Sequence, residues 1–360
     1  CGAAVLFGVK SGKYGLYSSR GAVSFGQSTR ACILGCSGLR VTSQERLFFS
    51  SNHPLGFILF ARNISTGPQI QALCDELRDC VGWNAPILID QEGGRVQRLR
   101  PPLGRDFLPP LEQCQRAGGQ ARRAMYLRFR IIAAELKALG IDVNCAPVAD
   151  IARPDTHPFL RNRCYGDTVA EVVGLARAAA DGLLEGGVVP VVKHMPGHGL
   201  GAVDSHHTLP QVTATAAALE QDDFAAFKGL NDLPMAMTAH VVYSACDSLP
   251  ATVSGRMLGI MRHQIGFSGL IMTDDISMQA LPGELDVRAQ AAIAAGCDVV
   301  LHCSSVLEEM IAVSHVVGRL GMTARQRAEG ALAQRNSGGS VDISNLDAQL
   351  AILVGKQAYD

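Results

Sequence analysis

Residues 188–210 read VVPVVKHMPGHGLGAVDSHHTLP. This stretch contains the clearest strand and loop signals of the chain, and the other segments are compared with it. Its apolar start is bounded by Gly and Pro and ends at Lys193 and His194, which predicts a buried β-strand. Three glycines follow and give the next segment unusual backbone freedom, which predicts a loop. That loop carries Asp204 and His206. A strand that ends in titratable groups and leads into such a loop predicts a catalytic element.

Seven other short apolar runs resemble the first, and segments of helical period separate most of them. Nearly continuous apolar character is typical of strands buried on both faces of a parallel sheet. The eight expected strands are 31–36, 56–63, 86–90, 141–150, 188–194, 234–243, 269–275 and 298–303. Eight alternating units favour a closed (β/α)8 TIM barrel in a single domain, for which ~250 residues suffice. An open doubly wound sheet is the alternative, but no Gly-x-Gly-x-x-Gly motif follows the first run.

Apolar periodicity also predicts the connecting helices. Residues 120–139 place large apolar side chains on one stripe, and Gly140 supplies a C-terminal stop. Thr168 and Glu171 have the spacing of a capping box, so a second helix is expected to begin there and to end near 186–187. Further helices are expected at 67–80, 213–230, 254–265, 285–296 and 305–318. The connections at 37–54 and 91–140 are less regular.

The two ends of the chain are expected to lie outside the barrel domain, which we place at residues 31–340. Residues 1–30 show no clear period and lack the layout of a signal peptide, so they predict a non-native or disordered extension. A genuine extra strand or arm is the alternative. Residues 341–360 are expected to form a polar C-terminal tail rather than a second domain.

The composition is that of an ordinary soluble globular enzyme, with 48% hydrophobic and 18% charged residues among 360. A formal net charge of −1 argues against a general nucleic-acid surface. No apolar stretch reaches the ~18 residues that span a bilayer, so no membrane partner is expected. The 11 cysteines are scattered without metal-type pairs, which predicts free thiols in a reducing compartment and a cytoplasmic protein. We expect a monomer without a cofactor.

Polar and titratable residues stand at the carboxyl ends of successive apolar runs. In a (β/α)8 barrel these ends form one rim, where the active sites of the fold are found. The residues expected at this rim are Asp90, Asp150, Lys193, His194, His240, Asp274 and Asp275. Their placement therefore favours a catalytic site over an even scatter of polar residues.

Two short motifs suggest the chemistry of this site. Asp274 and Asp275 follow an apolar run, and adjacent strand residues point to opposite faces, so one is expected to face the barrel axis while the other caps the following turn. Two turn or N-cap residues without catalytic function are the alternative. Asp204 lies two residues before His206, and a carboxylate so placed can orient an imidazole whose pKa of ~6.5 suits proton exchange.

A zinc site is the other interpretation of the histidines in this stretch. His194 and His198 have the spacing of a helical metal pair, but Pro196 between them argues against a helix. We therefore expect no metal.

Several longer motifs resemble glycoside hydrolase family 3, and in particular its bacterial β-N-acetylglucosaminidases of peptidoglycan recycling. These motifs are KHMPGHG (193–199) followed by the Asp204–His206 pair, DQEGGRVQR (90–98), GFILFARN (56–63), RNRCYGD (161–167) and TDDISM (273–278). The resemblance spans about residues 31–320. Met195 stands where the motif usually has Phe, and Cys164 and Tyr165 stand where Ser and Phe are usual.

The resemblance implies a single (β/α)8 domain and a retaining exo-β-N-acetylglucosaminidase that acts on peptidoglycan-derived muropeptides. It implies that Asp274 is the nucleophile, that His206 is the acid/base and that Asp204 is its partner. The side chains that it implies for binding N-acetylglucosamine are Asp90, Arg98, Arg163, Lys193 and His194. A phosphorylase with the same nucleophile is the alternative, and a metal-dependent hydrolase is a more remote one.

Overall fold

The computed structural model describes residues 25–201, 203, 209–335, 338–339 and 341–355. Eight parallel strands close into a barrel in the order β1-β12-β11-β9-β7-β6-β3-β2. The barrel strands are β1 (Arg30–Leu34), β2 (Pro54–Leu59), β3 (Ile87–Ile89), β6 (Val143–Asn144), β7 (Val189–Met195), β9 (Met235–Thr238), β11 (Leu270–Asp275) and β12 (Val299–His302). Each falls within or overlaps one of the eight apolar runs, which confirms the predicted barrel.

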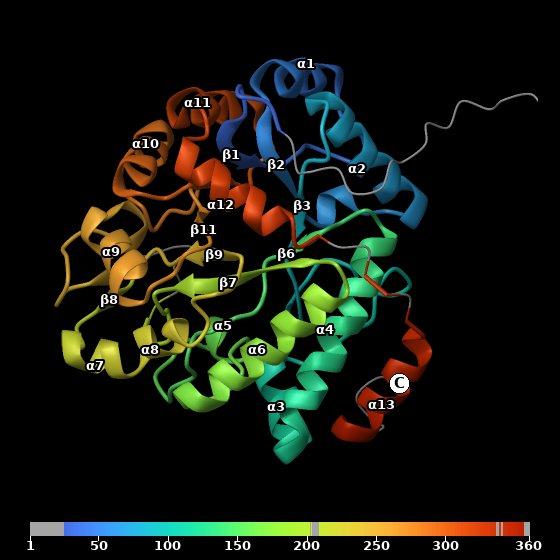
Figure 1. The fold of residues 1–360 in the computed structure, drawn as a ribbon, viewed down its shortest axis with the longest axis vertical. Coiled ribbons are helices and arrows are strands. Elements are labelled where there is room, and N and C mark those ends of the chain that lie inside the picture. The colour runs from blue at the N-terminus through green and yellow to red at the C-terminus, as the bar shows by residue number, and fades with distance from the viewer. Residues whose placement is uncertain (1–24, 202, 204–208, 336–337, 340, 356–360) are drawn as a thin grey trace, which may run out of the picture.

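Helices surround the barrel on its outside (Figure 1). They are α1 (Ser43–Asn52), α2 (Gly67–Val81), α3 (Pro110–Ala117), α4 (Ala121–Ala138), α5 (Pro158–Arg161), α6 (Val169–Glu185), α7 (Ala216–Gln221), α8 (Asp223–Lys228), α9 (Gly255–Gly259), α10 (Leu285–Ala295), α11 (Leu307–Val317), α12 (Met322–Leu332) and α13 (Ile343–Val354). Helix α12 crosses the end of the barrel that faces the viewer in Figure 1. Arg327 of α12 pairs with Asp298 at the start of β12, so this end carries the strands' amino termini.

Two connections and one strand differ from the prediction. The first connection contains α1, which begins after a capping box formed by Thr42 and Glu45. The helix expected at 213–230 is two helices, because Asp222 between them leaves helical geometry at φ −113° and ψ −88°. The expected strand at 141–150 is shorter, since only Val143 and Asn144 keep the ladder.

Both ends of the described chain extend beyond the expected domain. Phe25 is 5% exposed, its ring centroid lies 4.9 Å from that of Trp83, and the Arg325 guanidinium lies 4.7 Å above the ring. The packed core therefore reaches back into the segment expected as an extension; residues 1–24 lie outside the described part. At the other end, the expected tail contains helix α13, which packs on α4 and buries Leu350 and Val354.

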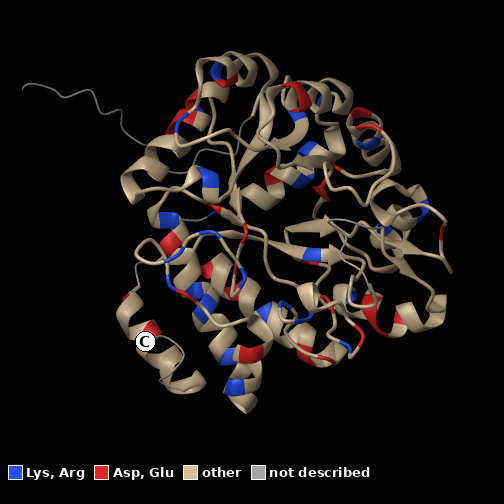
Figure 2. Ribbon diagram, turned by 180° about the vertical axis from the view of Figure 1, so that it is seen from behind, with Lys and Arg blue, Asp and Glu red and all other residues tan. Residues whose placement is uncertain are grey.

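Charged residues of both signs are interspersed over the ring of helices (Figure 2). This agrees with the near-zero net charge of the sequence. Within the described ranges, none of the helices is both long and apolar enough to span a bilayer.

Two small sheets lie outside the barrel ladder. Strands β4 (Gln91–Gly93) and β5 (Val96–Gln97) form an antiparallel hairpin directly after β3, and β8 (Gln211–Val212) pairs with β10 (Val242–Tyr243). The hairpin matters for function, because it carries part of the pocket described below.

Candidate active site

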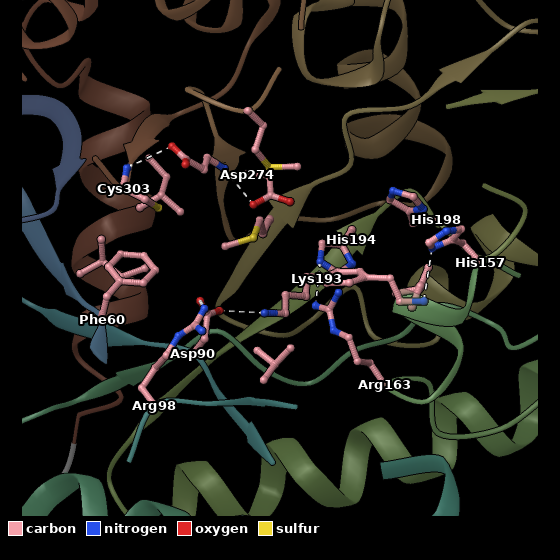
Figure 3. Close-up of a pocket in the computed structure, with 18 of the residues that line it drawn as sticks. Phe60, Asp90, Arg98, His157, Arg163, Lys193, His194, His198, Asp274 and Cys303 are labelled. Carbon is pink, nitrogen blue, oxygen red and sulfur yellow. Dashed lines mark hydrogen bonds and ion pairs between the residues drawn. The ribbon is translucent and has the colours of Figure 1, made fainter. Parts of the chain in front are cut away.

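One pocket opens at the carboxyl ends of the barrel strands (Figure 3). Seven of the residues predicted for the rim or the site line it, namely Asp90, Arg98, Arg163, Lys193, His194, Asp274 and Asp275. They come from different elements: the end of β3, the segment after β5, the segment after α5, β7 and β11. The closed barrel thus brings together side chains that lie up to 184 positions apart in the sequence, as the spacing of Asp90 and Asp274 shows.

A buried network of ion pairs forms one wall of the pocket. Lys193 Nζ lies 3.0 Å from Asp90 Oδ1 and 2.6 Å from Glu92 Oε1. Arg163 donates two hydrogen bonds to Glu92, from Nε at 2.9 Å and from Nη2 at 2.8 Å. Arg98 Nη2 donates to the second oxygen of Asp90 at 3.0 Å. Each acid therefore has two cationic neighbours or a bidentate one, the arrangement that makes burial of charge tolerable.

The network keeps its members charged. Burial by itself would raise the pKa of Glu92, but Arg163 and Lys193 outweigh burial and lower it to about 2. Burial would likewise raise the pKa of Asp90, yet Lys193 and Arg98 hold it below its usual value. For Lys193, burial lowers the pKa, and the two carboxylates more than reverse this. The wall therefore presents fixed charges and directed hydrogen-bonding groups rather than titrating ones.

His194 is oriented from both sides of its ring. Its Nδ1 lies 2.7 Å from Asp150 Oδ2, and its Nε2 lies 3.3 Å from Arg163 Nη2. Because the guanidinium can only donate, Nε2 is assigned as the acceptor and Nδ1–H as the donor to Asp150. The backbone N–H of His198 also donates to Asp150, at 2.6 Å. Asp150, predicted at the rim, thus supports the pocket from behind.

Asp274 and Asp275 have different surroundings, as the strand alternation predicted. Asp274 is half-buried and lines the pocket; its Oδ1 accepts a hydrogen bond from the Asp275 N–H at 2.8 Å. Burial raises its pKa, but His194, His240 and the Asp275 N–H together hold it below the usual value. Asp275 also borders the pocket, but its carboxylate caps the following turn, where it accepts from the Ser277 N–H and hydroxyl and from the Cys303 N–H.

A buried arginine supports the β4–β5 hairpin from below. Arg128 of α4 is fully buried; its Nε donates to the Glu92 carbonyl at 3.1 Å, and its Nη1 donates to the Leu108 carbonyl at 2.9 Å. It lies directly beside Gly93, whose φ of 98° falls in the left-handed region. A side chain at position 93 would collide with the Arg128 guanidinium.

Some predicted residues lie elsewhere, and some pocket residues were not predicted. Asp204 and His206 lie outside the described residues. His240 does not line the pocket; its ring contacts the Thr252 hydroxyl and the Asp275 carbonyl. Glu92 was missed although it stands inside the quoted DQEGGRVQR motif, where a second acid two residues after Asp90 was the available signal. Phe60 was also missed, although it stands inside the quoted GFILFARN motif directly after β2; His157 and Phe159, which line the pocket as well, follow no pattern that sequence reasoning uses.

Comparisons with known proteins place these observations in a family. The model of the glycosyl hydrolase family 3 N-terminal domain matches residues 31–332. A β-hexosaminidase of Alkalilimnicola ehrlichii is 39% identical over 279 residues, which cover 76% of this chain and 80% of the relative. A β-hexosaminidase of Chromobacterium violaceum is 41% identical over 280 residues, which cover 74% of this chain and 77% of the relative.

Solved structures agree with the sequence matches. NagZ from Neisseria gonorrhoeae, in complex with N-trifluoroacetyl-D-glucosamine, superposes with a TM-score of 0.81 at 27% identity, over 92% of this chain and all of that one. A family 3 β-N-acetylglucosaminidase from Paenibacillus superposes with a TM-score of 0.78 at 29% identity, over 91% of this chain and 68% of that one. The chain therefore belongs to glycosyl hydrolase family 3.

Proposed function

We propose that the protein is a retaining exo-β-N-acetylglucosaminidase that removes N-acetylglucosamine through a covalent glycosyl-enzyme. The observation that carries this proposal is one pocket in which a carboxylate, Asp274, faces a wall of fixed hydrogen-bonding charges (Figure 3). The relatives support the substrate class, because they are β-hexosaminidases and NagZ from N. gonorrhoeae was solved with an N-acylated glucosamine. The protein is a glycoside hydrolase of the β-N-acetylhexosaminidase type.

In the first step, Asp274 attacks the anomeric carbon, and the bond to the leaving oxygen breaks as that oxygen takes a proton. Asp274 suits this role because its lowered pKa keeps it ionised at neutral pH. His206 is proposed as the proton donor and Asp204 as its partner, roles that both rest on the family resemblance. Water then attacks the glycosyl-enzyme, with His206 as the base, and a second inversion restores the original anomeric configuration.

The ion-paired wall is proposed to bind the sugar. Asp90 can accept from sugar hydroxyls, while Arg163 and Lys193 can donate to hydroxyl or N-acyl oxygens. Since these side chains are held by one another before the sugar arrives, little reorganisation accompanies binding. The usual spacing rule of two carboxyl groups does not apply, because the proposed donor is an imidazole rather than a carboxylic acid.

We propose muropeptides derived from peptidoglycan as the natural substrate and the cytoplasm as the location. The resemblance to the bacterial recycling enzymes supports the first. The cysteines support the second: the ten in the described residues are all free thiols, nine of them buried. The relatives named above give no support to the phosphorylase alternative.

One assay tests the proposed function. The protein should hydrolyse an aryl N-acetyl-β-glucosaminide, and NMR of the first product should show the β-anomer. The matching aryl β-glucoside, which lacks the N-acetyl group, serves as the control substrate. Release of the α-anomer would rule out double displacement, and absence of turnover would rule out the enzyme class.

A further inference from the structure

A buried histidine lies beside the end of the strand that carries Asp274. His240 follows β9 by two positions and is 1% exposed. Its Nε2 lies 3.0 Å from the Asp275 carbonyl oxygen, and its Nδ1 lies 2.7 Å from the Thr252 hydroxyl. Because a carbonyl oxygen can only accept, Nε2 carries a proton and donates to Asp275. The imidazole is therefore held at one edge by Thr252 and holds the end of β11 with the other.

This contact stands where the regular barrel ladder has ended. The pairing of β9 with β11 stops at Met237 and Met272, three positions before Asp275. On the other side, the pairing of β11 with β12 shifts its register between Met272 and Asp275. The His240 imidazole thus supplies a hydrogen bond from the β9 side to the part of β11 that lies beyond the ladder.

Asp275 in turn orients the Asp274 carboxylate. The Asp275 N–H donates to Asp274 Oδ1 at 2.8 Å. The Asp275 carbonyl is anchored by His240, and its carboxylate is anchored by the Cys303 N–H and by Ser277. A rotation of the Asp275 backbone would move the N–H that orients Asp274. Reacting atoms must approach to about 3–3.5 Å, so even a small displacement of a nucleophile slows the reaction.

We propose that His240 is a positioning residue for Asp274. Its Nε2–H holds the Asp275 carbonyl, and the Asp275 backbone so fixed aims the Asp274 carboxylate at the anomeric carbon. His240 does not line the pocket, so it acts through Asp275 and not by contact with the sugar. The inference rests on the proposed function, in which Asp274 is the nucleophile, and extends the catalytic apparatus to a side chain behind the pocket.

The test replaces the two ring nitrogens of His240 separately. A glutamine amide reaches about as far as Nε2 and can donate to the Asp275 carbonyl, whereas an asparagine amide stops near Nδ1. Two quantities are measured: the rate constant of labelling by a fluorinated mechanism-based sugar, which reports attack by Asp274, and the inhibition constant of free N-acetylglucosamine, which reports binding. His240→Asn should slow labelling at least about tenfold, the effect of one lost hydrogen bond, with the inhibition constant unchanged. His240→Gln should recover most of the labelling rate.

Thr238→Val is the matched control. Thr238 is also buried at the end of β9, and its hydroxyl contacts the Thr252 hydroxyl at 2.8 Å, one hydrogen bond further from Asp275 than the imidazole. This variant should lose stability, as His240→Asn does, but it should be labelled at the wild-type rate. Slowing of Thr238→Val as large as that of His240→Asn would show that the imidazole is only part of the packed core.

The remaining outcomes separate this proposal from the proposed function. Equal slowing in His240→Asn and His240→Gln would overturn the role of the Nε2 donor, and a weaker inhibition constant that accounts for the slowing would place the effect in sugar binding. If His240→Asn does not fold, the labelling rate of folded His240→Gln decides: a wild-type rate supports the proposal and a slow rate overturns it. A wild type that is not labelled, or is labelled at a residue other than Asp274, would instead refute the proposed function or its nucleophile.

Discussion

At the scale of single residues, the adjacent pair Asp274 and Asp275 shows how one strand serves chemistry and structure at once. Asp274 accepts one backbone hydrogen bond and faces the pocket, whereas Asp275 accepts three and holds the turn after β11. The same chemical change at the two positions should therefore have opposite effects on activity and stability.

Asp274→Asn should abolish nearly all turnover, by about 10³-fold or more, because the glycosyl-enzyme needs a carboxylate nucleophile. Its melting temperature should change little, since the side chain is only half-buried. Asp275→Asn, the matched control, should retain more activity and lose about 1–3 kcal/mol of stability. A fluorinated mechanism-based sugar should label the wild type at Asp274, and peptide mapping of the label to Asp275 or Asp90 would contradict the assignment.

Glu92 offers a prediction about stability and pH. Glu92→Gln leaves the buried Arg163 without its carboxylate partner and Lys193 with Asp90 alone, so it should destabilise the fold by about 3–5 kcal/mol at pH 7. The pKa of Glu92 is lowered to about 2 from an ordinary 4.5, so its contribution is present above pH 4.5 and is lost as pH falls toward 2. Urea unfolding should therefore show that the difference in unfolding free energy between the wild type and Glu92→Gln becomes smaller below pH 4.5. A difference in unfolding free energy that stays constant down to pH 3 would show that the Glu92 charge does not stabilise the fold.

At the scale of elements, the order of strands could be predicted from the sequence, and the accessory elements could not. Strands buried on both faces give continuous apolar runs, so all eight barrel strands could be predicted from the sequence. The β4–β5 hairpin could not be predicted from an apolar pattern, because its residues Glu92 and Gln97 are polar and are buried by partners far away in the chain. Glu92 finds its partners on β7 and after α5, contacts that no local pattern records.

The segment before β1 gives a prediction at this scale. Phe25→Ala should lower the unfolding free energy by about 3–5 kcal/mol, because the ring is buried against Trp83 and beneath Arg325. Activity should stay near that of the wild type, since Phe25 lies at the opposite end of the barrel from the pocket. Leu47→Ala on α1 is the control, because Leu47 is 72% exposed. Equal stability of the two variants would mean that the core ends at Arg30.

At the scale of the whole molecule, the closed barrel places the ends of β3, β7 and β11 around one pocket. The rim could be predicted because strand ends gather wherever parallel strands close into a barrel. The partners within the rim could not, because pairing of Lys193 with both Asp90 and Glu92 depends on side-chain geometry that spacing does not encode.

The proposed mechanism uses a carboxylate and an imidazole, so it predicts an enzyme that needs no metal. Prolonged dialysis against a chelator should leave kcat and KM unchanged, as measured with the aryl N-acetyl-β-glucosaminide. Metal content before and after dialysis serves as the control. Stoichiometric zinc, with activity lost on its removal and regained on its return, would favour the metal-dependent alternative.

The contact between Gly93 and Arg128 has a consequence for how this sequence can change. Arg128 fills the space beside Gly93 and holds the hairpin that carries Glu92 and leads directly into Arg98. Neither position can then vary alone: a side chain at 93 has no room, and a smaller residue at 128 leaves the Glu92 and Leu108 carbonyls without their donor. Strong epistasis is therefore built into the pair. In a mutational library, single changes at either position should be depleted, and tolerated sequences should change both together.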